Sequence, residues 1–208
     1  MGLSLALGGI AAETIIFGPQ AKGESKAEPA LREPGLWIYH PVDPMEAGKL
    51  AYEEHATNGC SYSVFHGILA QLAEKYGEPY RSFPFRMMEF GNSGVGGYGS
   101  ICGGLVGAAA AIGLFLEGKA RNDMIAHLFK WYENTELPTY RPSQPIVIDT
   151  DIPAVVTQSI LCRNSKTAWC RKSGFSLDSK ERRERCYRLS GNIGMKTAEL
   201  LNGAFGEK

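Results

Sequence analysis

The sequence lacks the short cysteine motifs that would assign its chemistry directly. None of its five cysteines belongs to a Cys-x-x-Cys pair, which argues against a zinc ribbon and against a thioredoxin-like site. Cys-x-x-Cys-His is also absent, so covalently attached haem c is not expected. The odd number of cysteines argues against a closed set of disulfides. Three possibilities remain: a site assembled from distant cysteines, one disulfide with spare thiols, or cysteines that only fill the core.

The sequence also lacks a net charge. Its 22 basic residues balance its 22 acidic residues, so no overall field attracts nucleic acid or an anionic membrane. We therefore expect no nucleic-acid partner. With 208 residues, 44% of them apolar, the chain is long enough to bury one sizeable hydrophobic core.

The start of the chain has no apolar run long enough for a confident transmembrane helix. Residues Leu3–Phe17 form a mild, glycine-containing apolar run, and the polar stretch Gln20–Glu33 follows it. This order is typical of an export signal and its spacer, with a weak apolar region as in twin-arginine signals, although no twin arginine precedes Leu3. We predict a periplasmic or exported protein with a signal-like segment at 1–33 and a helical, cysteine-rich redox domain at 34–208. The alternatives are an uncleaved helix associated with the membrane and an ordinary N-terminal helix.

The remaining sequence predicts a mainly α, bundle-like single domain. No strong alternation of apolar and polar residues, the pattern of a half-buried strand, occurs in the sequence. Asp43 and Ser179 are expected to cap helices, with Pro44 at a first helical position. The stretch Leu137–Val156 contains four prolines and is expected to be an extended connection. The predicted helices are 43–57, 60–76, 101–118 (apolar on all sides, hence central and buried), 120–134, 159–172 and 179–203.

A glycine-rich loop precedes the predicted central helix. Gly94, Gly96 and Gly99 match G-x-G-x-x-G, but the flanking strands of a dinucleotide site are missing. We interpret the loop as a tight turn that directs Cys102 into the protein.

Two cysteines are expected at helix N-termini, where the thiolate is favoured. Cys60 follows Asn58-Gly59, and Cys102 follows the glycine loop. Unsatisfied N–H groups and the helix dipole lower a thiol pKa at such positions, and metal ligation needs the thiolate. Glycines beside these two cysteines would let N–H groups approach the sulfurs.

Three further cysteines lie late in the chain. Cys162 and Cys170 are eight residues apart on one predicted helix, so both could face one pocket, and Cys186 lies on the next helix. Four of the five cysteines would complete a Cys₄ iron–sulfur site, and all five are candidate cofactor-binding residues. As metal ligands we prefer Cys60, Cys102, Cys162 and Cys186, with Cys170 as the spare.

The other candidate residues carry weaker signals. No acid–base or nucleophile–base pair stands out, so no catalytic residue is assigned and an electron carrier is favoured over an enzyme. The run Lys180–Arg185 is expected to be a solvated face, with docking of a partner as the alternative. The four histidines are interpreted as structural, and non-covalent haem ligation stays open: His40, His55, His66 and His127.

Longer segments resemble the C-GCAxxG-C-C family of redox-active proteins, closest to exported members related to split-Soret cytochrome c. The resemblance covers about residues 34–202, and its most specific parts are FGNSGVGGYGSICGGLVGAAAAIGL, LCRNSKTAWC and SKERRERCYRLSGNIGMKTAELLN. It implies a mainly helical, homodimeric electron-transfer protein with an iron–sulfur site on the five cysteines. Split-Soret cytochrome also carries c-type haems, and that role does not transfer to a chain without Cys-x-x-Cys-His.

The functional prediction is therefore an electron-transfer protein with one iron–sulfur cluster, preferably [2Fe–2S] and otherwise [4Fe–4S]. Its redox partner would be another protein, a cytochrome or a membrane redox complex. One alternative is a docking subunit of a respiratory complex, with cysteines retained for packing or zinc. The other is a thiol–disulfide protein that uses Cys162 and Cys170.

Overall fold

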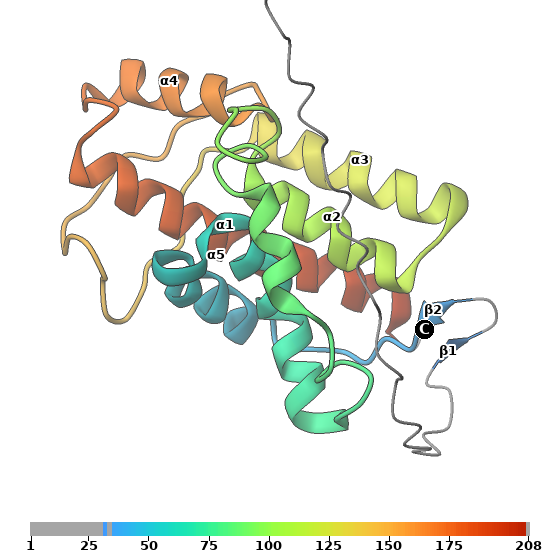
Figure 1. Ribbon diagram of the computed structural model, residues 1–208. Coiled ribbons are helices and arrows are strands. Elements are labelled where there is room, and N and C mark those ends of the chain that lie inside the picture. The colour runs from blue at the N-terminus through green and yellow to red at the C-terminus, as the bar shows by residue number, and fades with distance from the viewer. Residues whose placement is uncertain (1–30, 33–34, 207–208) are drawn as a thin grey trace, which may run out of the picture.

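Helices account for nearly all regular structure in the computed structural model, which describes residues 31–32 and 35–206 (Figure 1). The mainly α prediction is confirmed. The elements in chain order are β1 (Leu31–Arg32), β2 (Leu36–Trp37), α1 (Pro44–Tyr76), the 3₁₀ helix η1 (Phe85–Gly91), α2 (Gly103–Phe115), α3 (Gly118–Asn134), α4 (Cys162–Ser173) and α5 (Lys180–Phe205).

The core forms where α1 packs against α5 and α2. Val64 and Ile68 of α1 meet Leu105 and Ile112 of α2 and Ile193 of α5, and all five side chains are buried. Each buried aliphatic side chain of this size stabilises the fold by about 1.5–3 kcal/mol. The expected central helix is thus confirmed in α2, which ends at Phe115.

The caps predicted from the sequence are confirmed. Asp43 accepts hydrogen bonds from the backbone N–H groups of Met45 (2.8 Å) and Glu46 (3.4 Å), with Pro44 as the first helical residue. Ser179 accepts from the N–H of Arg182 at 3.1 Å and opens α5. These contacts fix where the two longest helices begin.

The two helices expected at 43–57 and 60–76 are one helix with a kink at Gly59. This residue has φ 81° and ψ 174°, a conformation that strongly favours glycine. The Asn92 side chain inserts at the kink, donating to the Asn58 carbonyl (2.9 Å) and accepting from the Ser61 N–H (3.1 Å). It thereby satisfies backbone groups that the kink removes from the helical ladder.

A buried charge network holds the extended connection 135–161 against the helices. Glu184 accepts from the Tyr52 hydroxyl and from Arg188 Nε, both at 2.8 Å, and the Arg188 guanidinium donates to the Thr150 carbonyl (3.0 Å). The expectation that Lys180–Arg185 is a solvated face was wrong for its last two residues. Glu184 and Arg185 are 0% and 2% exposed, because the connection and α4 cover that face of α5.

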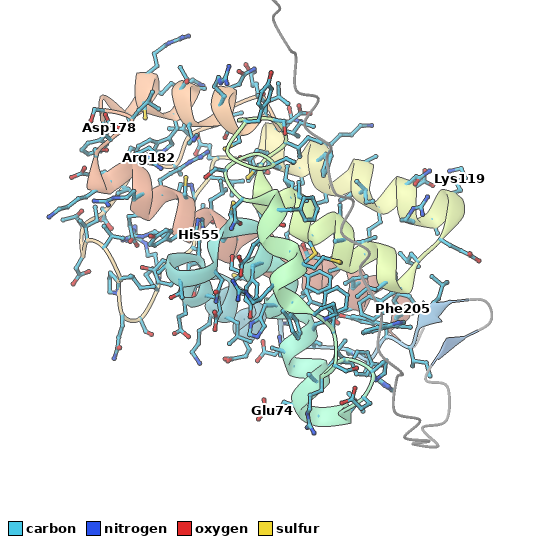
Figure 2. All side chains as sticks on the ribbon, viewed as in Figure 1. His55, Glu74, Lys119, Asp178, Arg182 and Phe205 are labelled. Carbon is cyan, nitrogen blue, oxygen red and sulfur yellow. The ribbon has the colours of Figure 1, made fainter. Side chains whose placement is uncertain are left out.

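Most of the predicted export segment, residues 1–33, lies outside the described residues, so that division of the chain stays a prediction. Within the described part of the chain, no helix combines the length and apolar character needed to cross a membrane. Figure 1 shows α4 at one end of the molecule and the end of α5 near the β1–β2 hairpin at the other. In Figure 2, His55 and Arg182 lie toward the α4 end and Phe205 toward the opposite end.

Candidate four-cysteine redox site

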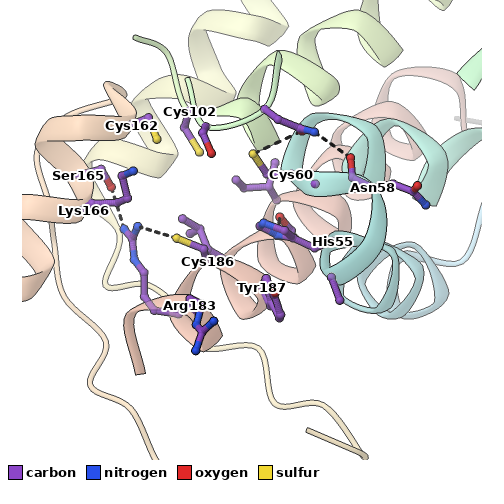
Figure 3. A pocket seen from close by; sticks show the side chains of 18 of the residues that line it. His55, Asn58, Cys60, Cys102, Cys162, Ser165, Lys166, Arg183, Cys186 and Tyr187 are labelled. Carbon is purple, nitrogen blue, oxygen red and sulfur yellow. Dashed lines mark hydrogen bonds between the residues drawn. The ribbon is translucent and has the colours of Figure 1, made fainter. Parts of the chain in front are cut away.

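A cavity of about 590 Å³ lies between α1, α2, α4 and α5. Four cysteines line it, each from a different helix or its cap, as Figure 3 shows. Cys60 follows the α1 kink, Cys102 is the N-cap of α2, Cys162 is the first residue of α4, and Cys186 lies in the second turn of α5. The four cysteines preferred as ligands from the sequence therefore surround one space, while their role as ligands stays a prediction.

Cys102 and Cys162 meet because the segments before them pair in antiparallel fashion. Ile101 forms an isolated β-bridge with Leu161. The Cys102 N–H donates to the Ile160 carbonyl (2.8 Å), and the Cys162 N–H donates to the Ser100 carbonyl (2.6 Å). A helix begins directly after each of these pairings, so two helix N-termini face the same cavity.

Cys60 is held against the start of α2. A Cβ added at Gly103 would lie 2.3 Å from Cys60 Sγ and 2.5 Å from the Gly91 carbonyl oxygen. Only glycine leaves room for the sulfur there. The glycine loop completes this wall with Asn92 and Ser93, which supports its interpretation as a turn beside Cys102.

Cys170 lies elsewhere and does not line the cavity. Its side chain packs with Val155 and Trp169 in a small separate apolar cluster. The eight-residue spacing allowed the two cysteines either to face one pocket or to face different sides of the helix. In the structure, Cys162 faces the cavity and Cys170 faces away from it.

The environment of the thiols differs from the expectation of lowered pKa values. Burial raises the pKa of Cys60 to about 12 and that of Cys162 to about 11, and in each case the neighbouring Cys102 is the second cause. Burial also raises the pKa of Cys102. Desolvation and the repulsion between thiolates outweigh the helix N-termini. Cys60, Cys102 and Cys162 are therefore protonated at neutral pH until a cation replaces the protons.

Backbone N–H groups near two of the sulfurs affect the thiol pKa values, and Gly103 leaves the room beside Cys60 that was expected of a neighbouring glycine. The backbone N–H of Ser93 lowers the pKa of Cys60, and those of Gly104 and Leu105 lower the pKa of Cys102, in each case by less than burial raises it. Such N–H groups favour the charged form of sulfur, whether thiolate or metal-bound.

A buried arginine, Arg185, forms part of the cavity wall. Its guanidinium donates to Ser165 Oγ at 2.7 Å and lies 4.0 Å from Cys186 Sγ. The dashed lines that end at the labelled Ser165 and Cys186 in Figure 3 mark these two contacts. Ser165 also bonds the Tyr132 hydroxyl at 2.8 Å. The Arg185 Nε is buried and has no hydrogen-bond partner among the described residues.

The rest of the wall is also basic. Lys166, Arg182 and Arg183 line the cavity, and Glu89 is the one acidic residue among the described lining residues. Glu89 is paired with Arg86 at 3.2 Å. The cavity therefore presents thiols inside a positively charged surround.

The described residues form no group of three or more histidine, cysteine, aspartate or glutamate side chains close enough to bind a single metal ion. The four sulfurs are instead distributed around a wider space. Sequence reasoning missed Arg185, Asn92, Tyr132 and Ser165 as parts of this site. The one local signal for Arg185 was its position directly before Cys186. It was overlooked because Arg185 ends the charged run Lys180–Arg185, which was interpreted as a solvated face.

Comparison with known proteins now assigns the class. A family model described as "Putative redox-active protein (C_GCAxxG_C_C)" matches residues 59–200. Split-Soret cytochrome c of Desulfovibrio desulfuricans (strain ATCC 27774 / DSM 6949 / MB) is 36% identical over 212 residues, which cover 96% of this chain and 76% of the relative. A solved structure described as "A novel iron centre in the split-Soret cytochrome c from Desulfovibrio desulfuricans ATCC 27774" matches with a TM-score of 0.78 and 38% identity, over 80% of this chain and 71% of that one.

The helical fold and the four-cysteine cavity thus define a redox-active protein that is similar to split-Soret cytochrome c. The chain belongs to the C_GCAxxG_C_C family. The resemblance inferred from the glycine loop and the late cysteines is confirmed.

Proposed function

We propose that this protein transfers electrons through one iron–sulfur cluster held by Cys60, Cys102, Cys162 and Cys186. The observation that carries the proposal is that four thiols from four separate segments line one cavity, while Cys170 lies outside it. Four cysteine thiolates are the usual ligand set of [2Fe–2S] and [4Fe–4S] clusters. The structural similarity to a cytochrome described as having a novel iron centre supports iron as the metal.

The residues present fit such a group. The space left at Gly103 accommodates the Cys60 sulfur, and backbone N–H groups near Cys60 and Cys102 favour the charged form of these two sulfurs. A wide cavity with distributed thiols suits a cluster of several atoms better than one ion. When bound, the cluster supplies one-electron redox chemistry. We prefer [2Fe–2S], with [4Fe–4S] as the alternative.

The chain's own residues would hold and tune this centre. The four thiols would give up their protons to hold the metal, and the N–H groups of Ser93, Gly104 and Leu105 would favour the charged form of two of the sulfurs. The buried core on α2 and α5 excludes water from one side of the cavity. The opposite side remains the route by which a partner approaches.

The thiol–disulfide alternative has little geometric support. Cys162 and Cys170 lie on the same helix, eight residues apart. At 1.5 Å per residue their Cα atoms are about 12 Å apart, and a disulfide requires less than ~7 Å. A bridge between them would require α4 to unwind. A docking subunit with zinc or metal-free cysteines remains the second candidate. Its one supporting observation is that Arg182 and Arg183, from the basic run Lys180–Arg185, line the cavity.

The partner is proposed to be another redox protein, a cytochrome or a membrane redox complex, and the chain to be an exported homodimer. Large apolar side chains are exposed on η1 and the glycine loop, next to the cavity. Met87, Phe90 and Tyr98 are 56%, 53% and 79% exposed. Apolar side chains gathered beside a redox site suit a protein–protein contact.

The test is anaerobic purification followed by iron and sulfide analysis and electron paramagnetic resonance of the reduced protein. We expect stoichiometric iron and acid-labile sulfide in the wild type. Single serine replacements at Cys60, Cys102, Cys162 and Cys186 should lose or alter the signal, and Cys170→Ser should keep it. An iron-free wild type from a host competent in cluster assembly, or zinc as the sole metal, would contradict the proposal.

A further inference from the structure

The buried guanidinium of Arg185 lacks a compensating carboxylate. Its residue is 2% exposed, and no described acidic side chain lies within salt-bridge distance of it. Burying an unpaired charge is strongly unfavourable, so buried arginines are normally matched by an anion. Among the described residues, Arg185 is therefore a buried cation without an anionic partner.

The groups that do surround Arg185 are hydroxyls and thiols. Ser165 Oγ, which accepts at 2.7 Å, is neutral, and Tyr132 reaches the same oxygen. Cys186 Sγ lies 4.0 Å away, and Cys102 and Cys186 are the nearby thiols that interact with the charge. The thiols are therefore the groups around this site that can become negative when a metal centre binds.

Building on the proposed function, we propose that Arg185 is the fixed counter-charge of the metal centre and raises its reduction potential. A cluster bound by four thiolates is anionic and becomes more negative on reduction, so a nearby cation favours the reduced state. The unpartnered Nε provides one further donor for a sulfur of the centre. Arg185 is thus a positioning residue that acts on the potential, not a ligand.

The other basic residues of the cavity are less suited to this role. Arg183 is exposed, and Lys166 and Arg182 are half-buried, so water and salt screen their charges. Arg185 sits behind Ser165 and Tyr132, where screening is weakest. Arg183, on the same helix and also at the cavity, therefore provides a matched control.

The experiment compares the reduction potentials of wild type, Arg185→Met, Arg185→Gln, Arg185→Lys and Arg183→Met. Spectroelectrochemistry of anaerobically purified protein gives the potential, and iron analysis and paramagnetic resonance check that the centre is intact. We expect a shift to more negative potential in Arg185→Met and Arg185→Gln that persists in high salt. Arg185→Lys should recover most of the wild-type value, and Arg183→Met should shift the potential only at low salt.

The outcomes separate the two proposals. Iron-loaded Arg185→Gln with the wild-type potential would overturn the role of Arg185 and leave the cluster assignment intact. Equal shifts in Arg185→Lys and Arg185→Gln would also overturn it, since the effect would then not depend on charge. A wild type without iron would instead overturn the proposed function, and this inference with it. If Arg185→Met fails to retain iron, the Gln and Lys variants decide, because both keep a donor to Ser165.

Discussion

Two buried arginines one turn apart on α5 stand in opposite surroundings. Arg188 is paired with Glu184 at 2.8 Å, and its Nη2 donates to the Ile148 and Thr150 carbonyls. Arg185 faces the cysteine cavity, with a serine and thiols around it and its Nε unpartnered. The charge of Arg188 is therefore balanced by Glu184, whereas the charge of Arg185 has no balancing carboxylate among the described residues.

On the same helix, the Glu184–Arg188 pair stabilises the fold, whereas Arg185 belongs to the candidate redox site. The Glu184–Arg188 network joins α1, α5 and the connection 146–150, and none of its fully buried side-chain N or O atoms lacks a partner. Unsatisfied buried groups are rare in folded proteins, and where they occur they call for a reason such as a bound group or a functional role. The incomplete cavity is therefore where a cofactor is to be sought.

The largest expected effect is on stability and concerns the Glu184–Arg188 pair. Glu184→Gln leaves the Arg188 charge buried without an anion and should lower the free energy of unfolding by about 3–5 kcal/mol. Chemical denaturation measures this loss. Glu199→Gln is the control, because it breaks only the partly exposed pair with Lys196 on the same helix and should cost under ~1 kcal/mol. Equal losses in both variants would show that burial does not distinguish the two pairs.

The next prediction compares two glycines of α2. Gly103→Ala forces a methyl group against Cys60 Sγ, so we expect a loss of about 1–3 kcal/mol in stability together with lower iron content. Gly113 has no atom within 4 Å of its would-be Cβ, and Gly113→Ala should stabilise the protein by about 0.5–1 kcal/mol. Thermal unfolding and iron analysis check both. If Gly103→Ala keeps full stability and iron, the wall beside Cys60 is not as tight as described.

A smaller effect depends on pH and lies outside the cavity, in the aromatic cluster of α1 and η1. His66 stacks on Tyr62 and contacts Phe85, and burial lowers its pKa, with Glu54 opposing the shift. The unfolded chain binds a proton below the ordinary histidine pKa of about 6.5, while the folded chain stays neutral until lower pH. Stability contributed by this group is therefore present above pH ~6.5 and lost as the pH falls below it.

His66→Phe should make the loss of stability between pH 7 and roughly pH 5 shallower. Thermal unfolding followed by circular dichroism measures the slope, with His127→Gln as the control because His127 is exposed. An unchanged slope in His66→Phe would assign the acid sensitivity to other groups.

The smallest expected effect concerns the basic rim. At low ionic strength the reduced protein should react faster with anionic ferricyanide than with a cationic oxidant of similar potential, because Lys166, Arg182 and Arg183 surround the cavity. Arg183→Glu should lower that ratio a few-fold, and salt should abolish the difference. Stopped-flow kinetics measures the ratio, and stability should change by less than about 0.5 kcal/mol. A ratio unaffected by the substitution would mean that electrons leave by another face.

Much of the fold could be predicted because its signals are local. Asp43 and Ser179 have side chains suited to capping a helix. Gly59, which follows Asn58, favours a break in the helix whatever packs around it. The break itself was misjudged as the end of a helix. It became a kink because Asn92, distant in sequence, supplies the missing backbone contacts.

The sequence by itself determined the helical class, the helix starts and the set of cysteines that could act together. Only the tertiary structure decided which of them meet: the pairing of Ile101 with Leu161 brings two helix N-termini together, and the rotation of α4 separates Cys162 from Cys170. It also decided that Glu184 and Arg185, within a run of charges, are buried, and that burial raises the thiol pKa values. The physical reason is that capping and periodicity act between neighbours in the chain, whereas desolvation and charge balance depend on which distant segments cover a side chain.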